Sequence, residues 1–530
     1  MKTDASPSEA FVSFPEAIAA HAASAPDEIA FRVDAHVLDW KTLDAHVREV
    51  ASALLANGVQ PGDRVALLGA ASLAYVECLF GAIAARACAV PLPVSASANA
   101  LERMIADSGA KLLLVDPAAD GDMARFVERV AATHRLSIVT LGSDPEVADA
   151  YVQWRASGDP ARALAPSRPD DAFNIIYSSG TTGLPKGIVH LHGMRQRQAA
   201  RKGFAFSPTS RSLLSTPIYS NTTIMPMLGA VANGGSCVLM RKFDAGSFIE
   251  TTHALGVTHT MLVPVQYRRI LDHPRFDRAR LASLTLSQST GAPMDVALKR
   301  DVLERWPGRF LEIYGLTEGG VSCFLEPRLH PDKLHTVGQP GHGTEVFLIG
   351  DDGVRLPQGV AGQAGEVVGR SPFMMAGYHN RPDADAEIRW FDEAGNLCHR
   401  TGDVGRFDDD GFLTLLDRKK DVIISGGNNI YAADLEAVLA KHADVAEVAV
   451  IGIPSQSWGE TPLAIVVARP GADLDPAALC AWANRAVGKT QRLSAVELRE
   501  ALPRNGLGKL SKKELRAPYW SAEAPAIGRP

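Results

Sequence analysis

The segment Tyr177–His190 reads YSSGTTGLPKGIVH, and its first residue is also the last residue of the apolar run Phe173–Tyr177. The apolar run predicts a buried strand, and the glycine- and hydroxyl-rich residues after it predict a loop. The glycines let backbone N–H groups turn toward a ligand, the serines and threonines add hydroxyl groups, and Lys186 adds a fixed positive charge. A loop of this composition suits a polyanion such as the phosphates of a nucleotide.

This loop differs from the Walker A phosphate loop. In Walker A a serine or threonine follows the lysine, and its hydroxyl binds magnesium. Here Lys186 lies between Pro185 and Gly187, so that hydroxyl is missing. A mobile Ser/Gly linker is one alternative, and a helix-capping loop is another that explains the hydroxyls but not the lysine. The residues expected to hold the phosphates are Ser178, Ser179, Gly180, Thr181, Thr182, Gly183 and Lys186.

Length and composition favour a multidomain protein that does not bind nucleic acid. The 530 residues are too many for one simple core, and a net charge of −6 leaves no basic excess for nucleic acid phosphates. Six scattered cysteines lack the paired spacing of zinc ligands, which is typical of reduced, mostly buried thiols in the cytoplasm. Arg86 and two prolines interrupt the most apolar region, Leu79–Val94, so no transmembrane segment is expected; the N-terminus has no signal-peptide pattern either.

The periodicity of apolar residues predicts the α/β class for most of the chain. Residues 11–165 alternate helical and strand-like patterns, including a helix over Trp40–Asn57 and a strand over Arg64–Leu68. Residues 166–345 repeat this texture around the phosphate loop, with a strand expected over Leu284–Ser287. After Asp417 the chain becomes charged and then glycine-rich, as in a hinge. The last hundred residues predict a compact α+β module.

Five ordered motifs resemble the adenylate-forming superfamily, which includes acyl- and aryl-CoA synthetases, peptide synthetase adenylation domains and firefly-type luciferases. The motifs are SSGTTGLPKG from Ser178, YGLTE from Tyr314, RTGD from Arg400, DRKKDVIISGGNNIYAADLE from Asp417 and PRNGLGK from Pro503. The resemblance covers essentially the whole chain. It implies a large N-terminal adenylation domain of several α/β subdomains over residues 1–417, a hinge at 418–421 that includes Lys420, and a smaller mobile α+β domain over 422–530.

The resemblance also implies ATP, magnesium and coenzyme A as cofactors, with a carboxylic acid as substrate. Glu318 would coordinate magnesium with the ATP phosphates, and Thr317 would bond the phosphate or the carboxylate. Tyr314 would stack on adenine, although a core tyrosine is an open alternative. The segment expected alongside the adenine and the acyl group is Thr290, Gly291, Ala292 and Pro293.

Further roles follow from the later motifs. Asp403, expected in a tight turn, would accept hydrogen bonds from the ribose hydroxyls, and Arg418 would contact the same ribose. Lys509 would bridge the carboxylate and the α-phosphate, whereas the nearby Lys512 and Lys513 suit a solvated basic face. After a domain rotation, a pantetheine arm would pass the loop that contains Ser425, Gly426 and Gly427.

The acyl pocket is the least determined part. Its candidate residues are Tyr219, Ser220, Thr223, Ser289 and Gly315. Ser220 occupies the place of a histidine in many relatives, so the role of that histidine does not carry over. The mixed lining favours an aromatic or medium-chain monocarboxylate. Two other functions stay open, namely loading of an acyl carrier protein and nucleotide binding without catalysis. Homodimer formation is also left open, and a cytoplasmic location is expected.

Overall fold

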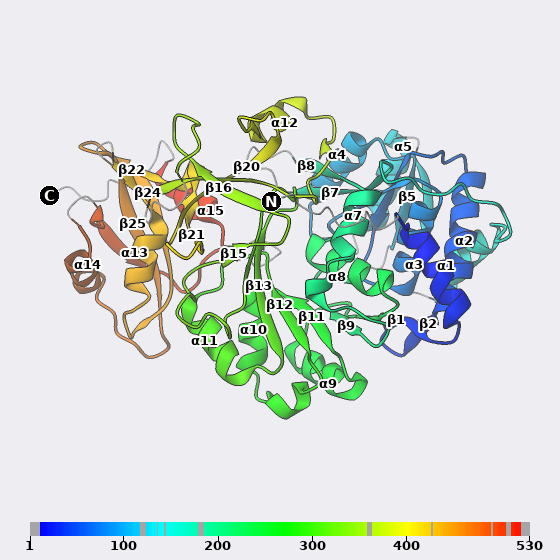
Figure 1. Cartoon of the computed structure of the whole chain (residues 1–530), viewed down its shortest axis with the longest axis horizontal. Helices are drawn as coiled ribbons and strands as arrows, with labels where there is room; N and C mark the ends of the chain where they lie inside the picture. The colour runs from blue at the N-terminus through cyan, green and yellow to red at the C-terminus, as the bar shows by residue number, and fades with distance from the viewer. Residues whose placement is uncertain are drawn as a thin grey trace, which may run out of the picture. The chain divides into compact units, whose positions relative to one another are not determined.

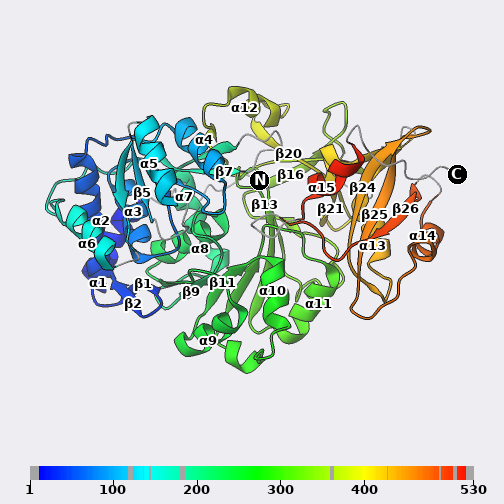
Figure 2. The same cartoon turned by 180° about the vertical axis from the view of Figure 1, so that it is seen from behind.

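The computed structural model describes residues 11–116, 123–134, 136–142, 145–178, 185–357, 363–425, 428–488, 491–504 and 510–520 (Figures 1 and 2). The chain forms two compact units. The first unit contains the chain up to Ser322 together with Glu326–Pro331 and Arg370–Arg389. The second contains Cys323–Leu325, Asp332–Gly369 and the chain from Trp390 onward. Helices alternate with strands through most of the chain, which confirms the predicted fold class.

One sheet of the first unit carries the predicted phosphate loop. Its strand order is β18-β8-β7-β4-β3-β5-β6. The bounds are β3 Arg64–Leu68, β4 Cys88–Pro91, β5 Leu112–Val115, β6 Ser137–Thr140, β7 Ala172–Ser178, β8 Lys186–Leu191 and β18 Gly377–Tyr378. Strands β3 to β7 are parallel, whereas β7 and β8 form an antiparallel pair on which β18 adds a short antiparallel edge. The loop after β7 therefore joins two adjacent strands.

The strands of the second sheet that belong wholly to the first unit have the order β13-β12-β11-β9-β10-β1-β2. The bounds are β1 Ile29–Val33, β2 His36–Asp39, β9 Arg211–Leu214, β10 Ser236–Leu239, β11 His259–Leu262, β12 Leu286–Ser289 and β13 Arg309–Gly315. All these strands are parallel except β2. The carboxyl ends of β11, β12 and β13 therefore meet at one edge, which is where ligands bind in open α/β sheets.

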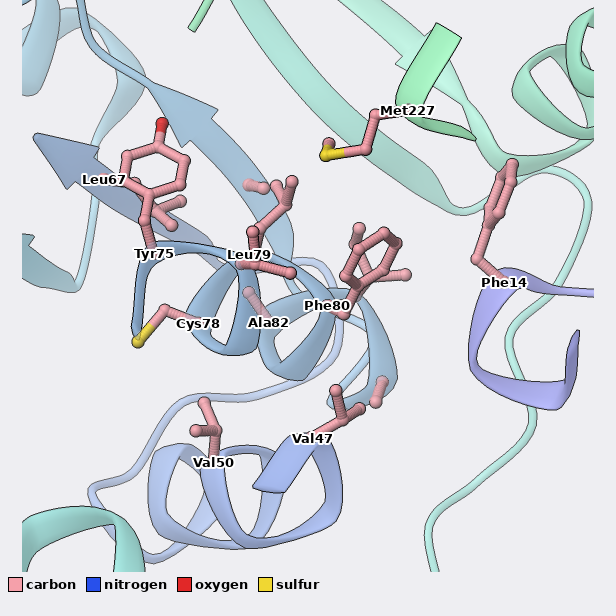
Figure 3. Packing of buried hydrophobic residues seen from close by; sticks show 14 of the residues in the cluster. Phe14, Val47, Val50, Leu67, Tyr75, Cys78, Leu79, Phe80, Ala82 and Met227 are labelled. Carbon is pink, nitrogen blue, oxygen red and sulfur yellow. The ribbon is translucent and has the colours of Figure 1, made fainter. Parts of the chain in front are cut away.

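Helices of the first unit pack against these sheets. They are α1 Phe14–Ser24, α2 Trp40–Ala56, α3 Leu73–Ala84, α4 Ala98–Ser108, α5 Met123–His134, α6 Pro145–Ala156, α7 His192–Ala199, α8 Asn221–Ala232, α9 Ala245–Leu255, α10 Pro264–Leu271, α11 Val296–Arg305 and α12 Pro382–Ile388. The largest core cluster joins α1, α2, α3 and α8; Figure 3 shows Val47, Phe80 and Met227 within it. Burial of these apolar side chains supplies the main stabilisation.

Local sequence signals explain where several of these helices begin. The side chain of Asp39 caps α2 by accepting a hydrogen bond from the Thr42 N–H at 2.7 Å, and Ser72 caps α3 in the same way. The predicted helix over Trp40–Asn57 and the predicted strand over Arg64–Leu68 are confirmed as α2 and β3. All six cysteines are free thiols, and five of them are buried, as expected.

The second unit contains two sheets of mainly antiparallel strands. The first has the order β16-β17-β20-β19, with β21 beside β20. The second has the order β23-β22-β25-β24, with β26 beside β25. The bounds are β16 Glu345–Ile349, β17 Ala364–Arg370, β19 Arg389–Phe391, β20 Leu397–Phe407, β21 Leu413–Arg418, β22 Ile423–Ser425, β23 Asn428–Ile430, β24 Val445–Ser455, β25 Gly459–Ala468 and β26 Ala495–Leu498. Strands β14 Ser322–Leu325 and β15 Gln339–Pro340 belong to neither of these sheets and pair antiparallel with each other.

Among the described residues of this unit, three α-helices accompany these sheets, namely α13 Ala432–Leu439, α14 Pro476–Arg485 and α15 Lys512–Arg516. Short 3₁₀ turns occur at Lys202–Phe204, Arg278–Leu281, Lys419–Asp421 and Ala517–Tyr519. The predicted hinge at 418–421 coincides with the end of β21 and the turn after it. The proposed division into residues 1–417, 418–421 and 422–530 stays a prediction.

Within the described ranges, none of the helices combines the length and the apolar character that crossing a membrane would require.

Candidate functional site

Lys186 lies at the start of β8, directly opposite the end of β7. Ser178 and Lys186 are antiparallel partners in this pair. The loop residues Ser179, Gly180, Thr181, Thr182 and Gly183 lie outside the described residues. The Lys186 Nζ atom is 3.4 Å from Glu387 Oε2 and 5.2 Å from the centre of the Tyr378 ring. The strand pair therefore fixes the base of the lysine, while its ammonium group meets an aromatic face and a carboxylate.

Glu318 follows β13 and is held by two segments that meet in the fold. Its Oε1 atom accepts a hydrogen bond from the Tyr378 hydroxyl at 2.8 Å, and its backbone carbonyl accepts one from the Met375 N–H at 2.9 Å. Burial and the nearby Glu318 carboxylate raise the pKa of Tyr378, so its O–H group stays a donor at neutral pH. Tyr378 therefore links the predicted magnesium ligand to Lys186.

Tyr378 is not among the site residues that the sequence predicts. The residue ends a short apolar stretch, and its position depends on the pairing of β18 with β8, where Tyr378 faces Ile188. In the sequence, Tyr378 is marked only by the preceding Gly377 and by the polar stretch HNRPD that follows it, and neither indicates a site residue. A contact between segments about 190 residues apart is not visible in local patterns.

The magnesium prediction can be tested against the residues present. Magnesium in nucleotide sites is bound by one or two carboxylates together with phosphate oxygens and water. Glu318 supplies one half-buried carboxylate of this kind. Across the part of the chain that the structure describes, no group of three or more His, Cys, Asp or Glu side chains could hold a metal ion. The residues fit a magnesium ion that arrives with ATP.

Thr317 is fixed from behind by a buried histidine. The Nε2 atom of His190 on β8 lies 2.7 Å from the Thr317 carbonyl oxygen. The His190 ring is fully buried, and burial together with the charge of Arg195 lowers its pKa well below the usual range. Neutral His190 therefore donates from Nε2 to this carbonyl. Tyr314, at the end of β13, is half-buried.

The Thr290–Pro293 segment leaves the carboxyl end of β12, which the structure places two residues later than the predicted strand Leu284–Ser287. The Thr290 N–H donates to the Leu262 carbonyl at 3.2 Å, and Gly291 has a φ of +88° that a side chain would strain. Ala292 is half-buried and Pro293 is exposed. The segment therefore lies at the edge where β11, β12 and β13 end.

Two predicted pocket residues lie at the ends of the same strands. Ser289 ends β12 and is fully buried; its hydroxyl has no hydrogen-bond partner among the described residues. Gly315 ends β13, where a Cβ would lie 3.1 Å from the Val321 carbonyl oxygen. The structure brings both residues to the edge that carries Thr290 and Thr317.

The remaining pocket candidates lie before and within α8. The Tyr219 hydroxyl is 3.1 Å from Ser95 Oγ. Ser220 caps the helix, because its Oγ accepts a hydrogen bond from the Thr222 N–H. The Thr223 hydroxyl donates to the Thr216 carbonyl at 2.7 Å and is therefore bonded within the protein. Ser220 thus has a structural role as a helix cap, which its sequence context did not predict.

Asp403 and Arg418, which are predicted to bind one ribose, lie side by side in the second unit. Arg418 Nε is 2.7 Å from Asp403 Oδ1, and the two residues face each other across β20 and β21. The expectation of a tight turn at Asp403 is wrong, because this residue lies inside the long strand β20. Gly402 lies within the same strand but has a φ of +69°, a left-handed conformation that is more typical of turns. The Thr-Gly-Asp step therefore looks like a turn in the sequence.

The hinge and the last motifs are only partly described. Lys420 is exposed in the turn after β21, and Ser425 is half-buried at the end of β22. Gly426, Gly427 and Lys509 lie outside the described residues. The interpretation of Lys512 as part of a solvated basic face is wrong, because its ammonium group lies 3.0 Å from Glu436 and 3.6 Å from Asp417. Lys513 is exposed, as expected.

Two family models match the chain. The model described as AMP-binding enzyme matches residues 18–379, and the AMP-binding enzyme C-terminal domain matches residues 434–509. A feruloyl-CoA synthase from an Amycolatopsis species is 34% identical over 498 residues, which are 93% of this chain and 96% of that protein. The fatty acid–[acyl-carrier-protein] ligase ScoC of Streptomyces coeruleorubidus is 31% identical over 520 residues, 96% of each chain.

A solved structure extends this similarity to the fold. The ATP-bound crystal structure of MatB from Rhodopseudomonas palustris superimposes with a TM-score of 0.86 at 26% identity. The match covers 96% of this chain and 99% of that one.

Proposed function

The chain belongs to the AMP-binding enzyme family, within the acyl- and aryl-CoA synthetases of the adenylate-forming superfamily, and we propose that it joins a carboxylic acid to coenzyme A. In the first step a carboxylate oxygen attacks the α-phosphorus of ATP, which forms an acyl-adenylate and releases pyrophosphate. In the second step the CoA thiol attacks the acyl carbonyl and AMP leaves. The enzyme is an AMP-forming acid–thiol ligase.

The arrangement of Lys186, Tyr378 and Glu318 is the observation that carries this proposal. The ammonium group of Lys186 lies 5.2 Å from the centre of the Tyr378 ring, and the carboxylate of Glu318 lies 2.8 Å from the Tyr378 hydroxyl. One tyrosine therefore contacts both a positive charge and a carboxylate. A magnesium-bound triphosphate needs both a cation for its negative oxygens and a carboxylate for its metal ion. Lys186 would neutralise phosphate charge, and Glu318 would hold the ion that accompanies ATP.

A pyrophosphate-release assay over a broad panel of aromatic and aliphatic acids, with and without CoA, tests the proposal. Release should require an acid, and with CoA present a thioester should form. Glu318→Gln should lose most of this activity. Glu326→Gln should retain it, because Glu326 pairs with Arg309 at 2.8 Å elsewhere in the unit. If no acid stimulates release by the wild type, the protein binds nucleotide without catalysis.

We propose an aromatic or medium-chain monocarboxylate as the acid. The pocket candidates Tyr219, Ser220 and Ser289 offer an aromatic ring and small hydroxyl groups but no cation that could pair with a second carboxylate. The relative named as a feruloyl-CoA synthase supports an aromatic acid. In the same assay a dicarboxylate such as malonate should be a poorer substrate than a phenylpropenoate by at least tenfold in kcat/KM.

A carrier protein as thiol donor is the second candidate. Ile424 and Trp458 are exposed by 56% and 61%, and they adjoin Ser425 and Gly459, which pair between β22 and β25. Exposed apolar side chains beside the predicted thiol-binding loop suit contact with a protein. The relative named as an acyl-carrier-protein ligase supports the same candidate. Discharge of the acyl-adenylate by a phosphopantetheinylated protein but not by free CoA would favour it.

A further inference from the structure

A fully buried arginine lies behind the candidate site. Arg195, on α7, has no exposed surface, and each of its guanidinium nitrogens donates a hydrogen bond. Its Nε atom donates to Asn174 Oδ1 at 3.0 Å, and Nη2 donates to His190 Nδ1 at 3.0 Å. Its Nη1 atom donates to Gln198 Oε1 and to Asn221 Oδ1, both at 2.8 Å.

All four of these acceptors are neutral. Burial lowers the pKa of Arg195 to about 9, so the guanidinium group is still charged at neutral pH. Within the described residues no carboxylate lies within ion-pair distance of it. A buried charge with only neutral partners is costly unless every donor is satisfied. Plain core packing would use an apolar residue at this position, so the arginine requires another explanation.

One arm of this network reaches the predicted catalytic segment. Arginine has donors but no acceptor, so its bond to Nδ1 of His190 requires that nitrogen to be unprotonated. Asn174 Nδ2 also donates to this atom, at 3.2 Å. The ring proton of neutral His190 therefore lies on Nε2, which donates to the Thr317 carbonyl at 2.7 Å. In this way Arg195 fixes the backbone immediately before Glu318.

The other arm reaches the predicted acid-binding segment. Asn221 is the first residue of α8 and directly follows Ser220, the cap of that helix. Its side-chain oxygen accepts from Arg195, so the same guanidinium group fixes the beginning of α8. Arginine is suited to this role because its planar donors hold several acceptors in fixed directions. A lysine could not hold the same set in place.

We propose that Arg195 is a positioning residue that couples the acid-binding segment Ser220–Thr223 to the nucleotide-binding segment Thr317–Glu318. This inference rests on the proposed function for the identity of the two ligands. Arg195 touches neither ligand and acts through His190 on one side and Asn221 on the other. Loss of Arg195 therefore disturbs both segments, whereas loss of one intermediate residue disturbs only one.

The test compares variants of the full-length chain that break one arm at a time. His190→Leu removes the arm to Thr317, and Asn221→Leu removes the arm to α8. His190→Gln is the conservative variant, because its amide can accept from Arg195 and donate to the Thr317 carbonyl. Arg197→Met is the matched control for Arg195→Met, because Arg197 lies on the same helix but is exposed. The melting temperature of each variant is measured to establish that it folds.

Two measurements separate the arms. Calorimetry with magnesium and adenosine 5′-(α,β-methylene)triphosphate gives the affinity for nucleotide without any acid. Pyrophosphate release gives the KM of the acid found in the screen. We expect about fivefold to tenfold weaker nucleotide binding in His190→Leu with little change in the acid KM, and the reverse pattern in Asn221→Leu. Arg195→Met should show both defects, and His190→Gln should bind nucleotide within about twofold of wild type.

The outcomes distinguish this inference from the proposed function. If no acid is activated by the wild type, the proposed function fails, but weaker nucleotide binding in His190→Leu still supports the first arm. If His190→Leu and His190→Gln bind the nucleotide as wild type does, the inference is overturned. It is also overturned if every variant only lowers the melting temperature, since Arg195 is then a structural contact. Should Arg195→Met not fold, the two single-arm variants decide the question.

Discussion

Within the described residues, the carboxylate of Glu318 is held by one side-chain hydrogen bond, which comes from the hydroxyl group of Tyr378. The hydroxyl donates at 2.8 Å, and the main chain of Tyr378 is itself fixed by the Asp385 carboxylate, which accepts its N–H at 2.8 Å. A carboxylate that is held by a hydrogen bond presents its second oxygen in a defined direction. This orientation is what a magnesium ion with strict octahedral geometry requires.

Tyr378→Phe should therefore weaken the use of magnesium without unfolding the protein. A lost hydrogen bond to a charged group corresponds to about 1.5–3 kcal/mol. We expect the magnesium concentration for half-maximal pyrophosphate release to rise about tenfold, while the melting temperature falls by only a few degrees and the protein stays folded. Tyr519→Phe is the control, because Tyr519 also donates to a carboxylate, that of Glu497, in the other unit. An unchanged magnesium requirement in Tyr378→Phe would show that Tyr378 does not orient Glu318.

The sequence could predict some of these residues and not others. Lys186, Glu318 and Asp403 belong to contiguous motifs, so their chemical type and local context identify them. Tyr378 and Arg195 act through side chains that approach from distant segments. Such contacts depend on strand pairing and helix packing, which local patterns do not contain.

At the scale of a single element, the start of α8 has both a structural role and a predicted role in substrate binding. Ser220 caps the helix and is also a candidate for the acid pocket. Removing a serine cap costs about 1 kcal/mol. Ser220→Ala should therefore lower the free energy of unfolding by about this amount, and Ser220→Phe should in addition shift the preference among acids.

Urea denaturation and the acid panel measure the two effects of Ser220 substitution separately. Ser97→Ala is the matched control, because Ser97 caps α4 by accepting from the Ala100 N–H at 3.3 Å. It should lose similar stability without changing the preference among acids. Equal losses for every acid in Ser220→Phe would mean that the pocket lies elsewhere.

A buried ion pair joins α11 to β13, the two elements beside the Thr290–Pro293 segment. Lys299 Nζ lies 2.6 Å from Glu312 Oε2, and the side chains are only 3% and 5% exposed. Burial raises the pKa of Glu312. Lys299→Met would leave this carboxylate buried without its partner, so it should lower the free energy of unfolding by about 3–5 kcal/mol.

The double variant Lys299→Met, Glu312→Leu removes both charges and should recover most of the stability lost in Lys299→Met. Arg48→Met is the control in the same urea denaturation experiment. It breaks a partly exposed i,i+4 pair with Asp44, and its cost should stay below about 1 kcal/mol. A double variant as unstable as Lys299→Met would contradict this explanation.

Element boundaries could be predicted where one face of an element is polar. The amphipathic helix α2 and the short apolar strand β3 agree with prediction to within one residue. The predicted bounds of β12 were two residues too early, because the last three residues of this strand are Ser287, Gln288 and Ser289, all of which are polar and buried. Polar residues inside a covered parallel sheet look like loop residues in the sequence.

At the scale of the whole molecule, the last sequence motif belongs to the second unit. Two lysines that follow this motif, Lys512 and Lys513, have different surroundings. Lys512 is fixed by Asp417 and Glu436, whereas Lys513 is exposed. The paired position of Lys512 could not be predicted, because the acidic partners lie about 75 and 95 residues away in the sequence. Its ion pairs connect α15 with β21, which ends at the predicted hinge, and with α13.

Lys509 should serve the adenylation step alone. Removing one positive charge from a reacting phosphate costs about two to three orders of magnitude in rate. Lys509→Ala should therefore form acyl-adenylate about 10²- to 10³-fold more slowly, yet convert supplied acyl-adenylate and CoA to thioester at a nearly normal rate. A bulky residue in place of Gly427 should show the reverse pattern. Lys513→Ala, the matched control, should leave both steps unchanged. Equal slowing of both steps in Lys509→Ala would contradict a division of the two half-reactions between these segments.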